Sequence, residues 1–344
     1  MNSPLKHSRT ARGRPALKLV KTETLDREQW LTVRKGGIGS SDAGAAVGLN
    51  PYKSRLELWM EKTGRDGNLP KADPNDETSP LYWGTLLEPI VAAHYTKRSG
   101  NRVRRINAVL QHPEEPWMLA NIDREVIGAA DVQILECKTA GINGARLWVE
   151  GVPEYVQLQV MHQLAVTGKQ AADVAVLIGG QELRIHRIDR DDAMIRQLIE
   201  LERDFWSYVE RDVAPPADGS ESADRALRSL YATGNGPSVD LSGDLRMSAV
   251  FSDLIAVRRT LATQEQLEAQ LVQAIQQRMG EASQAVFDSG SVSWKRSKDS
   301  SRIDVDRLRA EQPEIAQRFS VAKPGTRRFL ISNDGATDGR GDSD

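Results

Sequence analysis

Between residues 27 and 212 the chain alternates helical and strand-like hydrophobic patterns, and this order limits the folds it can adopt. The helical patterns cover residues 41–47, 55–62, 86–97, 143–149, 154–166 and 191–211. The strand-like runs cover residues 102–110, 118–126, 132–138, 173–178 and 182–188, and a Gly-Gly-Gln turn at 179–181 joins the last two. The alternation predicts an α/β protein with a mixed sheet flanked by helices.

Composition divides the chain into five parts. In order, we expect a basic mobile tail at 1–26, an α/β core at 27–213, a linker rich in Pro, Gly, Ser and Asp at 214–243, a helical arm with a small β region at 244–332, and an acidic mobile tail at 333–344. The basic tail can touch a polyphosphate or be a solvated arm.

The arm is expected to contain one long helix of about 35 residues. Val250, Leu254, Val257 and Leu261 follow the spacing of a coiled-coil seam. This helix can contact a partner or lie across the core. After Gly280 the pattern predicts a small hairpin, a short helix and a last strand near residues 327–331.

Composition also excludes several classes of protein. The single cysteine, Cys137, excludes an internal disulfide, a Cys-rich zinc site and a four-Cys iron–sulfur cluster held by one chain, so oxygen atoms must hold any metal. The longest apolar runs are far below the roughly 18 residues of a membrane span, and the N-terminus lacks the apolar segment of a secretion signal. We therefore expect a cytoplasmic protein with no membrane partner.

Two strand-like runs carry the residues that most clearly indicate chemistry. Because side chains two apart on a strand share a face, Glu136 and Lys138 project together and Cys137 points the other way. If the run ending in ANIDREV pairs with this strand, Asp123 joins them. Two carboxylates at the end of a buried strand favour Mg²⁺ or Mn²⁺, with the Cys137 backbone carbonyl as a possible further ligand. A metal held by carboxylates beside a lysine suits phosphodiester hydrolysis. The alternative is a surface strand with an ion pair across one face.

Two further polar residues fit such a site. Glu88 lies on the helix before the strands and can ligate a second metal, or it can be a first-turn glutamate favoured by the helix dipole. Gln159 lies on the helix after the strands and can hydrogen-bond the attacking water or a phosphate, or it can simply be exposed.

A glycine-rich turn at residues 36–44 predicts an anion site. It enters a helix at Ser40, Ser41 or Asp42, so free backbone N–H groups and a serine hydroxyl lie near Arg34. A phosphate fits these donors. No strand precedes the turn and Walker A is absent, so neither a dinucleotide site nor an ATP motor is expected.

Six short motifs occur in an order that resembles a known family. They are GIGSSD at 37–42, LNPY at 49–52, GTLLEP at 84–89, ANIDR at 120–124, LECKT at 135–139 and QVMHQLAVTG at 159–168. Together they cover roughly residues 30–210 and are similar to the YqaJ-like viral recombinase family, the lambda-exonuclease-type branch of the PD-(D/E)xK nucleases. The resemblance implies a restriction-endonuclease-like mixed sheet for the core.

The same resemblance implies a function and roles for residues. The function is a metal-dependent exonuclease of phage-type recombination, acting in the cytoplasm of a bacterial host, that resects the 5′-ended strand of duplex DNA and leaves a 3′ overhang for a single-strand annealing recombinase. By position, Asp123 and Glu136 are metal ligands, Lys138 the catalytic lysine, Glu88 the second carboxylate and Gln159 the motif glutamine. Arg34 and Ser41, or the adjacent Ser40, grip the 5′-phosphate, and Asp131 competes with Asp123 for the first ligand role.

Several alternatives stay open at this point. Family members can form rings around DNA, so a homo-oligomer is expected. A basic cluster can add salt-sensitive phosphate contacts or be a solvated turn; its members are Lys97, Arg98, Arg102, Arg104 and Arg105. An endonuclease of the same fold, or a catalytically inactive DNA-binding or phage assembly protein, would share most of these features.

Overall fold

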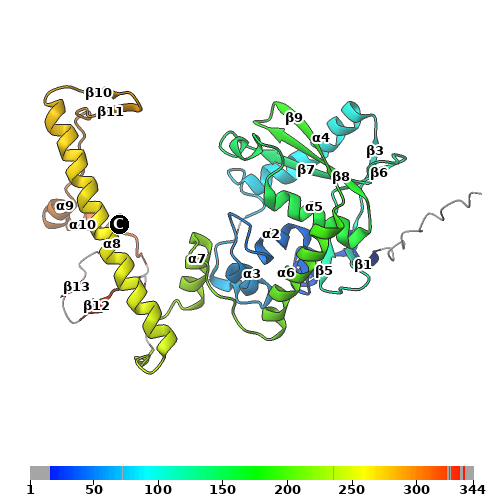
Figure 1. Cartoon of the computed structure of the whole chain (residues 1–344), viewed down its shortest axis with the longest axis horizontal. Coiled ribbons are helices and arrows are strands. Elements are labelled where there is room, and N and C mark those ends of the chain that lie inside the picture. The colour runs from blue at the N-terminus through cyan, green and yellow to red at the C-terminus, as the bar shows by residue number, and fades with distance from the viewer. Residues whose placement is uncertain are drawn as a thin grey trace, which may run out of the picture. The chain divides into compact units, whose positions relative to one another are not determined.

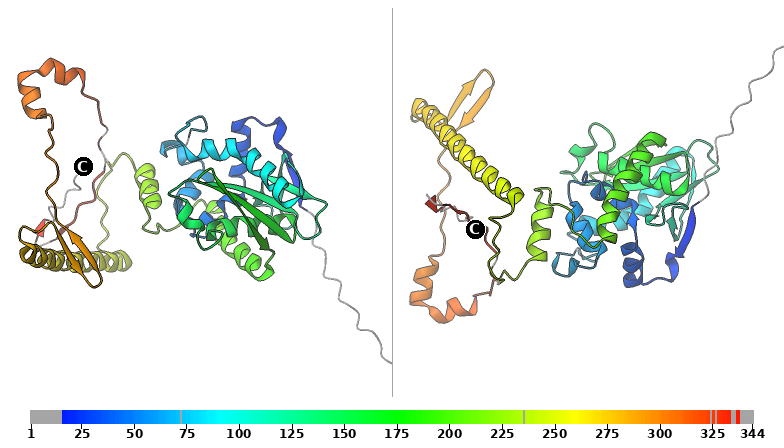
Figure 2. Two further views of the ribbon diagram at one scale, coloured as in Figure 1. Left: turned by 90° about the horizontal axis from the view of Figure 1, so that it is seen from above. Right: turned by 60° about the horizontal axis from the view of Figure 1, so that its bottom comes forward.

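The computed structural model describes residues 16–71, 73–234, 236–323, 325, 327–333 and 336–337. The chain forms two compact units, the first ending at Ala232 and the second beginning at Thr233. Figures 1 and 2 show the helices and strands of each unit, which we describe separately.

The first unit is built on two sheets. One has the order β1-β4-β5-β2, formed by β1 (Leu17–Lys21), β2 (Ile38–Gly39), β4 (Ala108–Gln111) and β5 (Met118–Ala120). The other has the order β3-β6-β7-β8-β9, formed by β3 (Arg102–Arg104), β6 (Arg124–Ile127), β7 (Ile134–Ala140), β8 (Ala171–Ile178) and β9 (Glu182–Asp189). Only β2 with β5 and β7 with β8 pair in parallel, so both sheets are mixed.

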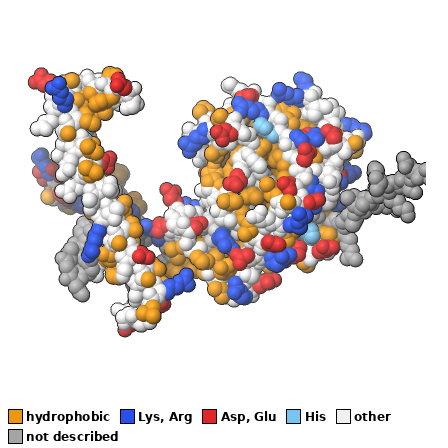
Figure 3. Space-filling model, viewed as in Figure 1, with side chains coloured by type: hydrophobic (Ala, Val, Ile, Leu, Met, Phe, Trp, Pro, Cys, Tyr) orange, Lys and Arg blue, Asp and Glu red, His pale blue; other side chains and the backbone are white. Residues whose placement is uncertain are grey.

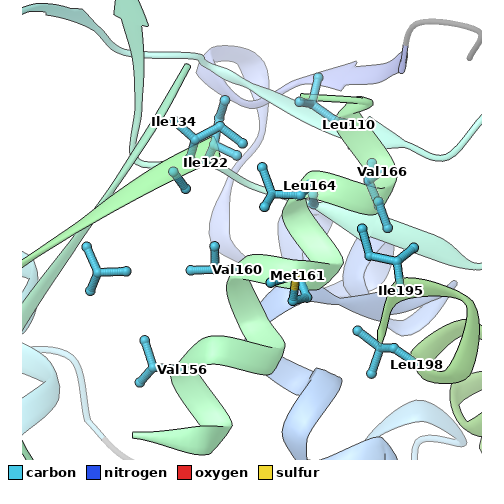
Figure 4. Close-up of a cluster of buried hydrophobic side chains, with 14 of the residues drawn as sticks. Leu110, Ile122, Ile134, Val156, Val160, Met161, Leu164, Val166, Ile195 and Leu198 are labelled. Carbon is cyan, nitrogen blue, oxygen red and sulfur yellow. The ribbon is translucent and has the colours of Figure 1, made fainter. Parts of the chain in front are cut away.

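Helices cover both faces of the five-stranded sheet. α4 (Pro80–Ser99) packs with Leu135 on one face, and α5 (Glu154–Thr167) packs with Ile134 on the other. α5 connects β7 to β8, as a parallel pair requires. Figure 4 shows the α5 side of the core, where apolar side chains of α5 lie between Ile134 of the sheet and Ile195 and Leu198 of α6 (Asp192–Glu210).

A second group of helices packs beside α6. It contains α1 (Arg27–Lys35), α2 (Ala43–Ala46), α3 (Arg55–Lys62) and α7 (Glu221–Leu230), together with the 3-10 turns η2 (Ser40–Asp42) and η3 (Asp66–Asn68). Two other 3-10 turns lie elsewhere: η1 (Thr22–Thr24) is beside β4, and η4 (Ala145–Trp148) places Trp148 in the core on the α5 side of the sheet. Its core includes Leu58, Met60 and Phe205, all with no exposed surface. Phe205 ties α6 to this cluster, so α6 belongs to both cores.

The second unit contains the expected long helix. α8 runs from Leu245 to Met279 over 35 residues, and a hairpin of β10 (Gln284–Phe287) and β11 (Gly290–Ser293) follows it. The unit also holds α9 (Val305–Glu311), α10 (Pro313–Arg318), β12 (Ser332–Asn333) and β13 (Ala336–Thr337). Exposed apolar side chains are spaced along α8, among them Val250, Val257 and Leu261 (Figure 3).

Several elements differ from the sequence-based expectations. The runs at 102–110 and 118–126 each break into two short strands that belong to different sheets, so Asn121 to Asp123 is a connection between sheets. The helix expected at 143–149 is only the turn η4. No strand forms at the expected 327–331; the short strands β12 (Ser332–Asn333) and β13 (Ala336–Thr337) follow it.

Other differences concern the ends of the units. The expected linker at 214–243 contains α7, which begins at the N-cap Ser220 and buries Ala223 and Ala226. Within the predicted basic tail, Leu17–Lys21 forms β1; residues 1–15 and most of the predicted acidic tail lie outside the described residues. In the part of the chain that the structure describes, no helix combines the length and apolar character needed to cross a membrane.

Candidate active site

Strand β7 brings Glu136 and Lys138 to the same face, as the period of two predicts. Glu136 is 2% exposed, and Lys138 Nζ donates to its Oε1 at 2.7 Å. Burial opposes charge on Lys138, but the carboxylate of Glu136 outweighs it and raises the pKa of Lys138 above its usual value. The side chain of Cys137 packs into the opposite core beneath α4. The strand thus places a carboxylate and an ammonium toward α5.

Asp123 joins this pair from the connection before β6. Because β6 pairs antiparallel with β7, with Arg124 opposite Leu135, Asp123 lies beside Glu136 in the middle of β7 and not at the expected strand end. Its Oδ2 accepts a hydrogen bond of 2.8 Å from the backbone N–H of Cys137. Burial and the negative charge of Glu136 raise the pKa of Asp123 to about 8. Two carboxylates therefore share a site that disfavours a second negative charge.

Two glutamines of α5 complete the surroundings of Glu136. Gln159 Nε2 donates to Oε1 of Glu136 at 2.5 Å, and its own Oε1 accepts from Lys138 Nζ at 2.9 Å. Gln163, which is fully buried, donates to Oε2 of Glu136 at 2.7 Å and to the backbone carbonyl of Asn121 at 3.2 Å. Gln163 was not among the predicted site residues. The sequence did contain a signal for it, because Gln163 lies four residues after Gln159 and so on the same face of the helix.

Glu88 lies well inside α4, rather than in its first turn. Its Oε1 forms a 2.5 Å ion pair with Nη1 of Arg124, which also donates to the backbone carbonyl of Asp123 at 2.6 Å. The negative charge of Glu88 contributes to the raised pKa of Asp123, after burial and Glu136. Arg124 is a further site residue that the sequence analysis missed, because α4 and β6 meet only in the folded chain.

Asp131, the alternative to Asp123, lies apart from these residues. Its carboxylate is exposed and pairs with Nη2 of Arg187 at 3.0 Å. That hydrogen bond lowers the pKa of Asp131. Arg187 also pairs with the buried Asp173, so Asp131 belongs to a structural ion-pair group on β8 and β9.

The residues predicted to bind an anion lie together at the end of α1. Arg34 Nη2 donates to Ser41 Oγ at 2.9 Å and to both carboxylate oxygens of Asp42 at 3.0 and 3.1 Å. The nearly buried Lys62 donates to Asp42 Oδ2 at 2.8 Å. Although burial would raise it, these two cations hold the pKa of Asp42 well below its usual range. Two cations face one carboxylate, which leaves the cluster net positive.

Ser40 has a different environment from Ser41. It is 5% exposed, and its Oγ lies 3.5 Å from the carbonyl of Asn121, whereas Ser41 is exposed beside Arg34. Gly37 permits the approach of this turn to the sheet, because a Cβ there would lie 2.5 Å from the carbonyl of Trp117. The structure therefore joins the anion site to the connection that carries Asp123.

The carboxylate oxygens of Asp123 and Glu136 suit a hard cation that has few protein ligands. In the described residues, no three acidic, imidazole or thiol side chains converge to form a complete metal site. Asp123 and Glu136 do converge, and the raised pKa of Asp123 is what an adjacent cation would relieve. Mg²⁺ commonly binds through one or two carboxylates and keeps water or phosphate oxygens in its other positions, so these residues fit it.

Comparisons with known proteins place the chain in a family. A family model described as the YqaJ-like viral recombinase domain matches residues 29–170. The uncharacterized protein YqaJ of Bacillus subtilis (strain 168) is 35% identical over 318 residues, covering 91% of this chain and 96% of that protein.

Two solved structures are also similar to part of the chain. The alkaline exonuclease LHK-Exo of Laribacter hongkongensis is 23% identical with a TM-score of 0.45, over 54% of this chain and 93% of that one. A phage-related exonuclease from Haemophilus somnus 129PT is 10% identical with a TM-score of 0.37, over 51% and 94%. On the strength of its identity to YqaJ along nearly the whole length, the chain belongs to the YqaJ-like viral recombinase family.

Proposed function

We propose that the chain is a divalent-metal-dependent deoxyribonuclease that resects the 5′-ended strand of linear duplex DNA. The observation that carries this proposal is the convergence of Asp123, Glu136 and Lys138 at the middle of β7. When bound by the two carboxylates, Mg²⁺ or Mn²⁺ supplies a more acidic water and neutralises charge on the phosphodiester. The 3′ overhang left by resection suits recombination by strand annealing, which agrees with a viral recombinase family.

The chain's own residues would orient the carboxylates and interact with the phosphate and the attacking water. Gln159 and Gln163 hold Glu136 in one orientation, because they donate to different oxygens of its carboxylate. Lys138, kept as an ammonium by Glu136, can donate to a phosphate oxygen or orient the attacking water. Arg124 neutralises Glu88 beside Asp123. Ring assembly, an annealing recombinase as partner and the Cys137 carbonyl as a ligand stay predictions from the sequence.

The distinction between an exonuclease and an endonuclease is tested with the topology of the substrate. Linear duplex and covalently closed circular duplex of the same sequence are incubated with Mg²⁺. We expect the linear form to be degraded and the closed circle to stay intact, because an anion site that grips a strand terminus needs an end. Cutting of closed circles would show an endonuclease of the same fold instead.

The anion site predicts a preference for phosphorylated ends. Among the described residues none accepts a hydrogen bond from Nη1 or Nε of Arg34, so both can meet a terminal phosphate. We expect 5′-phosphate ends to be resected about 10- to 100-fold faster than 5′-hydroxyl ends. Arg34→Gln should remove this preference. Arg203→Gln, which breaks an ion pair between α6 and Glu115 on the β4–β5 connection, should keep it. Equal wild-type rates on the two ends would exclude the anchoring role.

A further inference from the structure

His162 is a fully enclosed ionisable side chain near the proposed active site. It has no exposed surface, and both ring nitrogens face acceptors. Nδ1 lies 2.8 Å from Oε1 of Glu202 on α6, and Nε2 lies 3.0 Å from the backbone carbonyl oxygen of Leu119 on β5. Glu202 is also fully buried. The ring therefore joins three elements: its own helix α5, α6 and β5.

These contacts restrict where the protons can be. A backbone carbonyl only accepts hydrogen bonds, so Nε2 must carry a proton. Nδ1 faces a carboxylate and donates to it when the ring is an imidazolium. Burial disfavours that charge, but Glu202 outweighs burial and raises the pKa of His162.

Of the other titratable groups around the ring, Asp42 supports the imidazolium and His112 does not. The carboxylate of Asp42 in η2 also raises the pKa of His162, and His112, on the β4–β5 connection, is the other titratable ring nearby. Oε2 of Glu202 is buried without a hydrogen-bond partner among the described residues. A carboxylate in that position needs a charged partner close to its other oxygen, and His162 supplies it.

Helix α5, which His162 joins to α6 and β5, also carries two of the side chains that hold Glu136. Gln159 and Gln163 flank His162 on α5 and both donate to Glu136. Gln163 also donates to the carbonyl of Asn121, two residues after Leu119 in the segment that leads to Asp123. Any rotation or shift of α5 against β5 would therefore move both glutamines relative to the carboxylates.

We propose that His162 is a positioning residue, whose imidazolium, clamped between Glu202 and the Leu119 carbonyl, fixes α5 against β5 and so holds Gln159 and Gln163 on Glu136. Its role in catalysis rests on the proposed nuclease function, whereas its protonation state does not. The His162–Glu202 pair lies outside the set of groups that touch substrate.

The protonation state is tested by NMR on the intact wild-type chain. The chain has five histidines, so the ring ¹⁵N signals of a histidine-labelled sample are few. At pH 8 in chelator, where an ordinary histidine with a pKa near 6.5 is neutral, one ring should show two protonated nitrogens. This signal should vanish in His162→Gln. A neutral ring at position 162 in the wild type would overturn the proposal.

The positioning role is tested by a variant that keeps the shape of the pair. Glu202→Gln removes the counter-charge, so the ring should be neutral at pH 8, and the charge-assisted hydrogen bond at Nδ1 gives way to a weaker one between neutral groups. We expect kcat for linear duplex to fall about 10- to 100-fold while KM for DNA changes less than about twofold. Glu200→Gln, an exposed glutamate of the same helix, should match the wild type in both constants.

The outcomes separate this proposal from the proposed function. A wild-type kcat in Glu202→Gln, or a change confined to KM, would exclude the positioning role. If Glu202→Gln does not fold, the wild-type spectrum still decides whether His162, between Glu202 and the Leu119 carbonyl, is an imidazolium. If the wild type hydrolyses no DNA, the nuclease function fails even when the spectrum shows a doubly protonated ring.

Discussion

Replacing Lys138 with alanine is expected to slow phosphodiester hydrolysis about 10³-fold while the fold survives. The ammonium donates to both Glu136 and Gln159, so its loss removes the cationic donor of the site. Glu136 keeps its two glutamine donors, which is why we expect little change in thermal unfolding. The measurement is the single-turnover rate on linear duplex with saturating Mg²⁺, together with DNA affinity.

A lysine outside the site provides the control for this prediction. Lys169 is about one-third exposed and forms a loose 3.5 Å pair with Glu125, so Lys169→Ala should hydrolyse DNA at the wild-type rate. A Lys138→Ala rate within about tenfold of the wild type would contradict a catalytic role. A change in DNA affinity alone would favour a catalytically inactive DNA-binding protein.

Asp123→Asn is expected to abolish hydrolysis and yet stabilise the metal-free chain. Because the folded pKa, about 8, lies above the ordinary value of 3.8, ionising Asp123 costs the folded state free energy. The cost begins above pH 4 and is complete above pH 8. Asparagine keeps an acceptor for the Cys137 N–H but carries no charge. At pH 8 in chelator, we expect the free energy of unfolding to rise by on the order of 2 kcal/mol.

Asp131→Asn is the matched control, and its effect should have the opposite sign. Asp131 is exposed, and its pKa is lowered by Arg187, so losing its charge removes a favourable interaction. Chemical denaturation at pH 8 compares the three chains. Adding Mg²⁺ should stabilise the wild type and Asp131→Asn but leave Asp123→Asn unchanged, because a ligand stabilises only the state that binds it. If metal-free Asp123→Asn is less stable than the wild type, the claim that the charges of Asp123 and Glu136 together destabilise the folded chain is wrong.

The parts of the site predicted from the sequence are those that depend on local geometry. The period of a strand alone places Glu136 and Lys138 on one face, and the pairing of β6 with β7 brings Asp123 beside them. Arg34 and Ser41 meet because one short turn joins them. The mixed sheet flanked by helices follows from the order of the elements.

The parts that were missed depend on contacts between distant segments. Arg124 pairs with Glu88 across 36 residues of sequence, and Lys62 reaches Asp42 from another helix, so neither pair leaves a local pattern. The strands predicted at 102–110 and 118–126 were too long, because within each run the chain passes from one sheet to the other. The short amphipathic helix α7 was not predicted, because the flanking Pro, Gly and Ser residues dominate the composition of this segment.

The most direct test of the central claim is digestion of a linear duplex labelled at its 5′ ends, with Mg²⁺ and with chelator. The carboxylate pair of Asp123 and Glu136 predicts release of labelled mononucleotide with Mg²⁺ and none in chelator, with no release by the Lys138→Ala chain. Release that persists in chelator, or a wild-type chain that releases no label with either Mg²⁺ or Mn²⁺, would contradict the proposed metal-dependent nuclease.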